Sequence, residues 1–276
     1  NNNININRCY DLKNLKDITF KINQSEINNI ETKIIPINIE FFLLQKIEKD
    51  KKRLSDISEL KWGTSASGYG KKKIKKLEFE SLSENNKKLY KPILQTSDTK
   101  SYFIDWQEEF IPINIYSDNI IKEFNKDKIL IGRLTKKIQA CIDLEKRFVG
   151  KTTLITNSKI DLKILLAILN SNFINKWYYL KFETTHMAGG YLRYDIPYLS
   201  QIPIPTISIN QIDKIKNIVE NIIEKKKKGE FTLDLEQQID NLVYKLYALT
   251  YDEVLVVEPE FSERMSREVY EGLKVE

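Results

Sequence analysis

The stretch of sequence that most constrains the fold is residues 161–180, DLKILLAILNSNFINKWYYL, in which apolar side chains recur at three- and four-residue steps. The resulting apolar stripe consists of Leu162, Leu165, Leu166, Leu169, Phe173 and Trp177, widened by Ile164, Ile168 and Ile174. A helix that is apolar over so much of its surface must be buried against other elements. The pattern therefore predicts one helix over 161–180, packed on a β-sheet.

Several strand-like segments precede this helix in the sequence. Apolar and polar residues alternate within 90–116, around a turn at Ser97–Thr99. Further strand candidates are 57–62, 128–134 and 148–156. The last of these, FVGKTTLIT, resembles the end of a Walker A loop, but the first glycine of such a loop would fall at Glu145. We therefore interpret it as a strand. The fold class predicted is α+β, with twisted, largely antiparallel β-sheets and a buried central helix.

Two more helices are predicted after the sheets, at 209–228 and 233–249, and the short link between them favours an antiparallel helical pair. Gly229 is placed to end the first of them. The chain is expected to divide into a connector at 1–50, with an amphipathic helix near Ile39–Lys49, a main domain at 51–206, the C-terminal helical pair at 207–250 and an acidic tail at 251–276. The first residue is not Met, so the chain is expected to be a piece of a longer one.

The net charge of +5 is unevenly distributed. Residues 251–276 hold eight acidic residues against three basic ones, a net charge of −5, so residues 1–250 carry +10. A basic body of this kind attracts polyanions, with an affinity that falls with salt. The sequence contains no run of roughly eighteen apolar residues, so no membrane span is predicted. The N-terminal residues lack the apolar centre of a signal peptide. Cys9 and Cys141 stand alone, which indicates a reducing, cytoplasmic location.

Two glycine-containing stretches are candidates for contact with a nucleic acid. The loop Gly63–Gly70 is followed by Lys71, Lys72, Lys73, Lys75 and Lys76, and its small hydroxyls and lysines suit a phosphate backbone. The alternative is a solvated hairpin with a lysine edge. In 189–205, GGYLRYDIPYLSQIPIP, the glycines permit a positive φ, and Arg193 suits a guanine edge or a phosphate. The alternative there is a glycine turn followed by an ordinary edge strand.

Catalytic candidates are few. Asp143 with Asp161 and Lys163 loosely follows a nuclease carboxylate–lysine pattern, but Asp161 stands where an acid would begin the 161–180 helix. His186, the only histidine, has no nucleophile or acid at a recognisable spacing, so a structural role is expected.

Six segments in order resemble one family. They are LSDISELKWGTSASGYG, YKPILQTSDTKSYFIDW, KILIGRL, DLKILLAILNS, GGYLRYDIPYLSQIPIP and LEQQIDNLVYKLYALTYDEVLVVE, which run from about residue 52 to 258. Together they resemble the TaqI-like C-terminal specificity domain, the target-recognition region of N6-adenine DNA methyltransferases and of type IIG restriction enzymes. The resemblance implies that residues 51–206 read double-stranded DNA while an N-terminal methyltransferase domain or subunit performs the chemistry.

What the resemblance implies about the site follows from the positions of these segments. The DNA-binding residues expected are Trp62, Thr64, Ser65, Lys71, Lys72, Lys73, Lys100, Tyr102, Arg133, Lys136, Lys137, Gly189, Gly190, Tyr191, Arg193 and Tyr194. No catalytic or metal-binding residue is assigned. The chain contains neither an Asn-Pro-Pro-Tyr-type motif nor a glycine-rich S-adenosylmethionine loop, so S-adenosylmethionine, with Mg²⁺ as a further candidate, is expected in a separate catalytic part. The alternatives are a stand-alone specificity subunit, a protein-docking scaffold and a Mg²⁺-dependent nuclease.

Overall fold

The computed structural model describes residues 3–8, 18–23, 39–64, 68–182 and 187–273. These residues fall into two compact units, Asn1–Lys49 and Asp50–Glu276. The first unit contains the antiparallel pair β1 (Asn3–Arg8) and β2 (Ile18–Asn23), followed by helix α2 (Ile39–Glu48). The amphipathic helix predicted near Ile39–Lys49 is confirmed.

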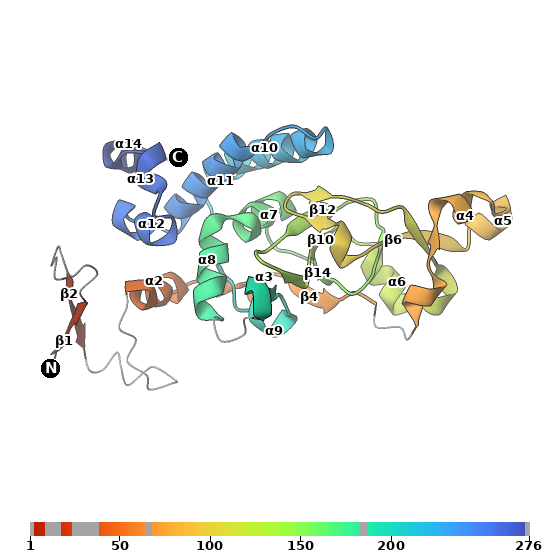
Figure 1. The fold of residues 1–276 in the computed structure, drawn as a ribbon, viewed down its shortest axis with the longest axis horizontal. Coiled ribbons are helices and arrows are strands. Elements are labelled where there is room, and N and C mark those ends of the chain that lie inside the picture. Colours follow the sequence, from red (N-terminus) through yellow and green to blue (C-terminus); the bar gives the residue numbers. More distant parts are fainter. Residues whose placement is uncertain (1–2, 9–17, 24–38, 65–67, 183–186, 274–276) are drawn as a thin grey trace. The chain divides into compact units, whose positions relative to one another are not determined.

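The second unit is built on a four-stranded antiparallel sheet (Figure 1). Its strands, in spatial order, are β12 (Ala140–Asp143), β10 (Lys128–Ile131), β14 (Thr153–Thr156) and β4 (Glu59–Trp62). Every side chain of β10 and β14 is buried, so both faces of the sheet must be covered. Helices α7 and α8 lie on one side, and α10 lies beyond α7 (Figure 1).

A second sheet covers the other face. Its spatial order is β13 (Phe148–Val149), β6 (Tyr90–Leu94), β9 (Glu109–Pro112) and β5 (Ile74–Lys75), with β13 and β6 parallel and the other pairs antiparallel. Leu130 and Leu154 of the first sheet share a buried cluster with Ile93 and Ile111 of the second. Because aliphatic side chains contribute about 1.5–3 kcal/mol each when fully buried, this cluster is a main source of stability. The predicted class, α+β with largely antiparallel sheets, is confirmed.

Short elements complete the second unit. They are β3 (Lys52–Arg53), β7 (Thr99–Lys100), β8 (Phe103–Ile104), β11 (Leu134–Thr135), β15 (Leu192–Arg193), β16 (Pro203–Ile204), α3 (Leu54–Ile57), α4 (Lys76–Glu80), α5 (Glu84–Lys87), α6 (Asp118–Phe124) and α9 (Ile196–Leu199). The 3₁₀ turns are η1 (Tyr69–Lys72), η2 (Thr96–Asp98), η3 (Ile113–Ile115) and η5 (Ala188–Gly190). The turn predicted at Ser97–Thr99 is confirmed by η2.

The single helix predicted over 161–180 is wrong in one respect. The segment forms two helices, α7 (Leu162–Asn170) and α8 (Asn172–Lys181), because Ser171 between them is extended with φ −64° and ψ 148°. The Ser171 hydroxyl donates to the carbonyl oxygen of Ile168 and accepts from the amide of Ile174, so it ends one helix and begins the next. The Asn-Ser-Asn triplet at 170–172 was the sequence signal for this break.

Two predicted strands are also interrupted. In 148–156 the chain turns at Gly150–Thr152 between β13 and β14, and in 128–134 it leaves the sheet at Gly132 between β10 and β11. In 189–205 the predicted extended run is broken by α9, after which Pro203–Ile204 pairs with β3 in a two-stranded sheet. In each case a turn places polar side chains beside the end of the central sheet.

The C-terminal helical pair is present. Helices α10 (Ile209–Lys227) and α11 (Leu233–Leu246) are joined by a short link in which Gly229 has φ +72°, and α10 packs on both α11 and α7. The residues predicted to form an acidic tail are folded instead. They form α12 (Tyr251–Val257), α13 (Phe261–Arg264) and α14 (Arg267–Gly272), because Tyr251, Phe261 and Tyr270 pack into a buried aromatic cluster.

A buried carboxylate in α11 makes the stability of this region pH-dependent. Burial raises the pKa of Asp240 to about 7, although its side chain accepts a hydrogen bond from the Asn172 amide at 2.7 Å. A raised folded-state pKa means that stability is greatest at low pH and is lost as pH rises through 7. We expect the free energy of unfolding to increase by about 2 kcal/mol between pH 7.5 and 5.5. Asp240→Asn, which keeps an oxygen for the Asn172 amide, should remove this increase in urea unfolding; an unchanged pH dependence would contradict the assignment.

Candidate nucleic-acid interface

The site begins where three strands of the central sheet end together. The Gly63 amide donates to the carbonyl oxygen of Thr152 at 2.8 Å, and a Cβ at position 63 would overlap the carbonyl oxygen of Gly150. Only glycine permits this approach, which fixes the exit of β4 against the turn before β14. As a result the indole of Trp62, 41% exposed, lies at the sheet end directly beside that turn.

Arg133 lies at the same end of the sheet, just after β10. Its guanidinium carbon is 4.3 Å from the centroid of the Trp62 ring. Its Nε and Nη2 donate to the same Asp195 carboxylate oxygen, at 3.2 and 2.9 Å. The Arg133 carbonyl oxygen accepts from the Tyr194 amide at 2.9 Å. Both the backbone and the side chain of Arg133 are therefore held in place, while its side chain remains 39% exposed.

The glycine stretch joins this site through the pair β11–β15, in which Leu134 faces Arg193. Gly189 and Gly190 have φ +80° and +77°, a conformation that favours glycine, and they turn the chain so that Met187 and Tyr191 form an antiparallel bridge. This turn leaves Tyr191 and Arg193 exposed. The Lys136 ammonium lies 5.8 Å from the Tyr191 ring centroid, and Lys137 is exposed beside it.

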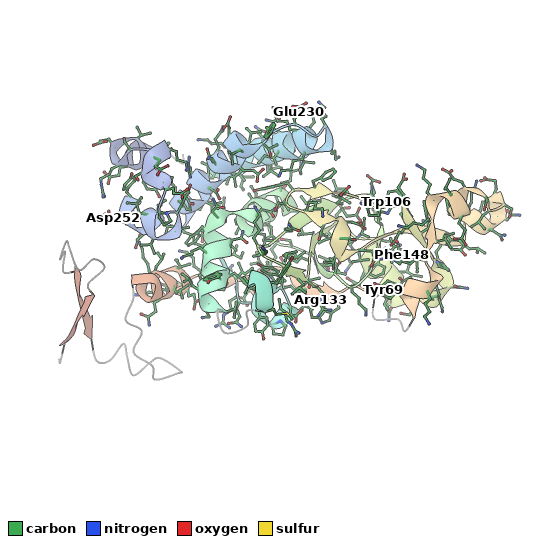
Figure 2. The ribbon with its side chains drawn as sticks, in the orientation of Figure 1. Tyr69, Trp106, Arg133, Phe148, Glu230 and Asp252 are labelled. Carbon is green, nitrogen blue, oxygen red and sulfur yellow. The ribbon has the colours of Figure 1, made fainter. Side chains whose placement is uncertain are left out.

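Further cations come from η1 and the Gly150–Thr152 turn. The Tyr69 hydroxyl donates to Gln95 at 3.0 Å and accepts from the Lys151 amide at 3.3 Å, which ties η1 to that turn. Lys71, Lys72 and Lys151 are exposed and form no ion pair with any acid that the structure describes. Tyr69 and Arg133 lie along the same side of this unit, opposite Glu230 at the α10–α11 link (Figure 2).

We call this surface the basic face and define it by its exposed or partly exposed aromatic and basic side chains, namely Trp62, Lys71, Lys72, Arg133, Lys136, Lys137, Lys151, Tyr191 and Arg193. Arg133 in this face pairs with Asp195, but its lysines and Arg193 form no ion pair with any described acid, unlike many other cations of the unit. Lys73, a predicted DNA-binding residue, forms an ion pair with Glu109, and Lys75 pairs with the same carboxylate at 3.1 Å. Lys73 is therefore less available to a phosphate than Lys71 or Lys72.

Three predicted contact residues lie inside the domain. Thr64, Tyr102 and Tyr194 are 3%, 3% and 1% exposed. Burial raises the pKa of Tyr194 well above its ordinary value, so the phenol stays neutral, and its ring packs 4.8 Å from Tyr178. Tyr102 lies near α10, with the Lys226 ammonium 5.9 Å from its ring centroid. These side chains support the fold. Lys100 is exposed on β7, and Ser65 lies outside the described residues.

Sequence reasoning missed two members of the site. Lys151 lies in a run that resembles the end of a Walker A loop and that we interpret as a strand, although the Gly-Lys pair in it is also a turn signal. Asp195 was overlooked because the residue it holds, Arg133, lies 62 positions away in the chain. No local pattern could have shown that pairing.

The acids of the nuclease alternative are used structurally. Asp143 is fully buried and pairs with Lys128 at 2.7 Å and Arg147 at 2.9 Å. Asp161 begins α7, as predicted, and accepts from the Lys163 amide at 2.8 Å. Although burial opposes it, this amide and the Lys216 ammonium lower the pKa of Asp161. Among the described residues, no three His, Cys, Asp or Glu side chains gather in a way that could hold a metal ion.

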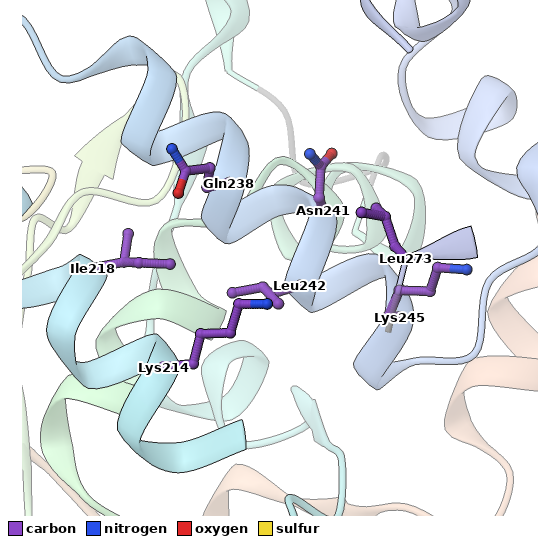
Figure 3. A pocket seen from close by; sticks show the side chains of 7 residues that line it. All are labelled: Lys214, Ile218, Gln238, Asn241, Leu242, Lys245 and Leu273. Atoms are coloured by element: carbon purple, nitrogen blue, oxygen red, sulfur yellow. The ribbon is translucent and has the colours of Figure 1, made fainter. Parts of the chain in front are cut away.

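A pocket of about 130 Å³ lies elsewhere, between α10 and α11 (Figure 3). Its lining consists of Lys214, Ile218, Gln238, Asn241, Leu242, Lys245 and Leu273. These seven residues include no carboxylate, hydroxyl, thiol or imidazole. No helix of the described segments is both long enough and apolar enough to cross a membrane.

Comparison with known proteins identifies the class. Residues 91–204 match the model of the TaqI-like C-terminal specificity domain. The resemblance seen in the sequence is therefore confirmed, and this segment is a TaqI-like C-terminal specificity domain. Of the basic face, it contains Arg133, Lys136, Lys137, Lys151, Tyr191 and Arg193.

Two individual proteins are similar. The type II methyltransferase M.MjaIV of Methanocaldococcus jannaschii is 30% identical over 133 residues, which cover 45% of this chain and 42% of that protein. The chain thus spans about two-fifths of the length of this relative. Among solved structures, the type IIG restriction endonuclease BpuSI is similar with a TM-score of 0.46 and 12% identity, over 90% of this chain and 37% of that one.

Proposed function

We propose that this chain is the target-recognition part of a restriction–modification methyltransferase and that it binds double-stranded DNA in a sequence-specific manner through the basic face. The observation that carries the proposal is the clustering of exposed lysines without acidic partners, together with Arg133 and Arg193, beside exposed Trp62 and Tyr191 at one end of the central sheet. Lysines without acidic partners can replace the counterions of phosphates, and aromatic and arginine side chains can reach base edges. This is the division of contacts that a duplex reader needs.

The chemistry is proposed to lie in a separate part. A methyltransferase domain or subunit on the N-terminal side would bind S-adenosylmethionine and methylate a target adenine, with Mg²⁺ required where cleavage accompanies methylation. The specificity domain would grip the duplex and set its register, so that the target base is presented to that part. The similarity to a type II methyltransferase supports this arrangement.

A protein-docking scaffold is a second candidate, favoured by one observation. Phe231, in the link before α11, is 95% exposed, and Leu233, the first residue of α11, is 64% exposed. A neighbouring pair of exposed apolar side chains gives a protein partner a surface to cover. In this alternative the basic face would have no role in binding. The two candidates therefore differ in whether the chain binds DNA at all.

The deciding experiment measures binding of the chain to a random-sequence duplex and to duplexes selected from a random pool, over a range of salt concentrations. We expect nanomolar-range affinity for the selected duplex, weaker binding to the random one and a steep fall in both with salt. Absence of duplex binding at about 50 mM salt would exclude the proposed function and leave the docking scaffold.

Arg193→Ala should lower affinity chiefly for the selected duplex, by about 1–3 kcal/mol. The reason is that Arg193 is exposed on β15 and forms no ion pair with any described acid, so all its donors can reach DNA. Titrations of both duplexes with the variant measure the two losses separately. An equal loss on both would make Arg193 a phosphate contact.

A further inference from the structure

Arg133 is restrained in a way that no other exposed arginine of the basic face shares. The Trp62 ring supports one face of its guanidinium at 4.3 Å, and Asp195 accepts from its Nε and Nη2. Arg193 has neither support. An arginine that is already ordered loses less side-chain entropy on binding, which favours a position-dependent contact over a diffuse one.

The donors that remain on Arg133 determine what it can bind. Asp195 occupies the Nε–Nη2 edge, and the structure shows no partner for Nη1 among the described residues. The Nη1–Nη2 end of the fork therefore still has N–H groups to offer, and the side chain is 39% exposed. Two parallel N–H donors match the O6 and N7 acceptors that guanine presents in the major groove.

The charge of the pair argues for a base rather than a phosphate. Arg133 and Asp195 together carry no net charge, and the Asp195 carboxylate would repel a phosphate brought close to the guanidinium. A guanine edge is uncharged and is not repelled in this way. The neighbouring lysines, Lys136, Lys137 and Lys151, have no such acid beside them in the described structure and suit phosphates better.

We propose that Arg133 is a specificity-determining residue that reads the guanine of one G·C pair in the major groove, and that Trp62 and Asp195 are its positioning residues. This inference rests on the proposed function and adds to it the base class that the site reads. The competing explanation is that Arg133 and Asp195 only fasten the β10–β11 link to the start of α9. That role predicts a loss of stability without any change in base preference.

The test compares base preferences of wild-type chain, Arg133→Ala and Arg133→Lys by selection from a random duplex pool. Each guanine of the wild-type consensus is then replaced in turn by 7-deazaguanine, which lacks the N7 acceptor. For the wild type we expect one guanine whose replacement by another base weakens binding roughly 5- to 150-fold. At that position Arg133→Ala should be indifferent to base and to 7-deazaguanine, while its preferences elsewhere persist. Arg133→Lys, which keeps a donor but lacks the planar fork, should show a weakened guanine preference at the same position only.

Asp195→Asn and Trp62→Ala should reduce discrimination at the same base pair and at no other, which a merely structural role would not do. Thermal unfolding of each variant shows whether it is folded. If Arg133→Ala does not fold, Arg133→Lys, which retains the charge, serves as the test variant. Retention of the full guanine preference by a folded Arg133 variant would overturn the inference and leave the proposed function standing. Failure of the wild type to bind any duplex would instead overturn the proposed function, and this inference with it.

Discussion

Replacing Lys71, Lys72 and Lys151 together with alanine should lower the affinity of the chain for every duplex by about 500-fold at 0.1 M salt, which corresponds to about 3.7 kcal/mol. All three side chains are exposed, and none pairs with an acid that the structure describes. Lys71 and Lys72 belong to η1, and Lys151 belongs to the turn before β14. The Lys151 amide donates to the hydroxyl of Tyr69 in η1, which joins the two segments. Loss of all three therefore removes one contiguous patch of positive charge.

The size of this effect follows from counterion release. Each phosphate that a lysine neutralises contributes about 0.9 to the slope of log affinity against log salt concentration. Three lost contacts should reduce the slope by about 2.7, so the affinities of the variant and the wild type should converge near 1 M salt. Because phosphate contacts carry no sequence information, selected and random duplexes should lose affinity equally. Titrations by fluorescence anisotropy at several salt concentrations measure both quantities.

A control with the same change of net charge is available on α10. Lys225, Lys227 and Lys228 lie at the end of this helix, beside Glu230 on the opposite side of the unit from Tyr69 and Arg133 (Figure 2). Lys225 and Lys228 pair with Glu230 and Glu224. Their joint replacement with alanine should change the salt slope little. If both triple variants lose the same affinity, general attraction by net charge explains the binding, and the basic face does not.

The main helices were predictable because they are long and strongly periodic. The apolar stripe of 161–180 located the helices that cover the sheet, and the seam of 209–228 located α10. What the sequence showed only weakly was the break at Ser171. There the local signal, two asparagines flanking a serine, is weaker than the surrounding periodicity. The break also depends on residues distant in the sequence. The Ala140 amide donates to the Asn170 side chain, and the Ile138 amide donates to the Asn175 side chain.

The site was predictable in outline for a different reason. Cations and aromatic residues beside glycine turns are exposed in most folds, so Trp62, Lys71, Arg133 and Tyr191 could be nominated from local sequence. Whether a given side chain is free, paired or buried depends on the tertiary structure. That is why Lys73 proves to be paired with Glu109, and why Thr64 proves to be buried beside β13.

Asp143→Ala should destabilise the second unit by about 3–5 kcal/mol, because it leaves a buried ammonium without its counterion. Lys128 and Asp143 are both fully buried, 2.7 Å apart, on neighbouring strands β10 and β12. Burial lowers the pKa of Lys128, and the Asp143 carboxylate opposes that fall. Asp143 also accepts hydrogen bonds from the backbone and the side chain of Arg147. Urea unfolding monitored by circular dichroism measures the loss.

The double variant Lys128→Met/Asp143→Ala should be less destabilised than Asp143→Ala alone, since it removes both charges from the interior. Asp161→Ala is the matched control: it deletes the acid that begins α7, which is about a third exposed, so its cost should be about 1 kcal/mol. The same two single variants separate a structural acid from a catalytic one. A Mg²⁺-dependent cleavage of duplex DNA by the wild type that disappears in folded Asp161→Ala would favour the nuclease, because a helix-capping role gives no reason for that loss.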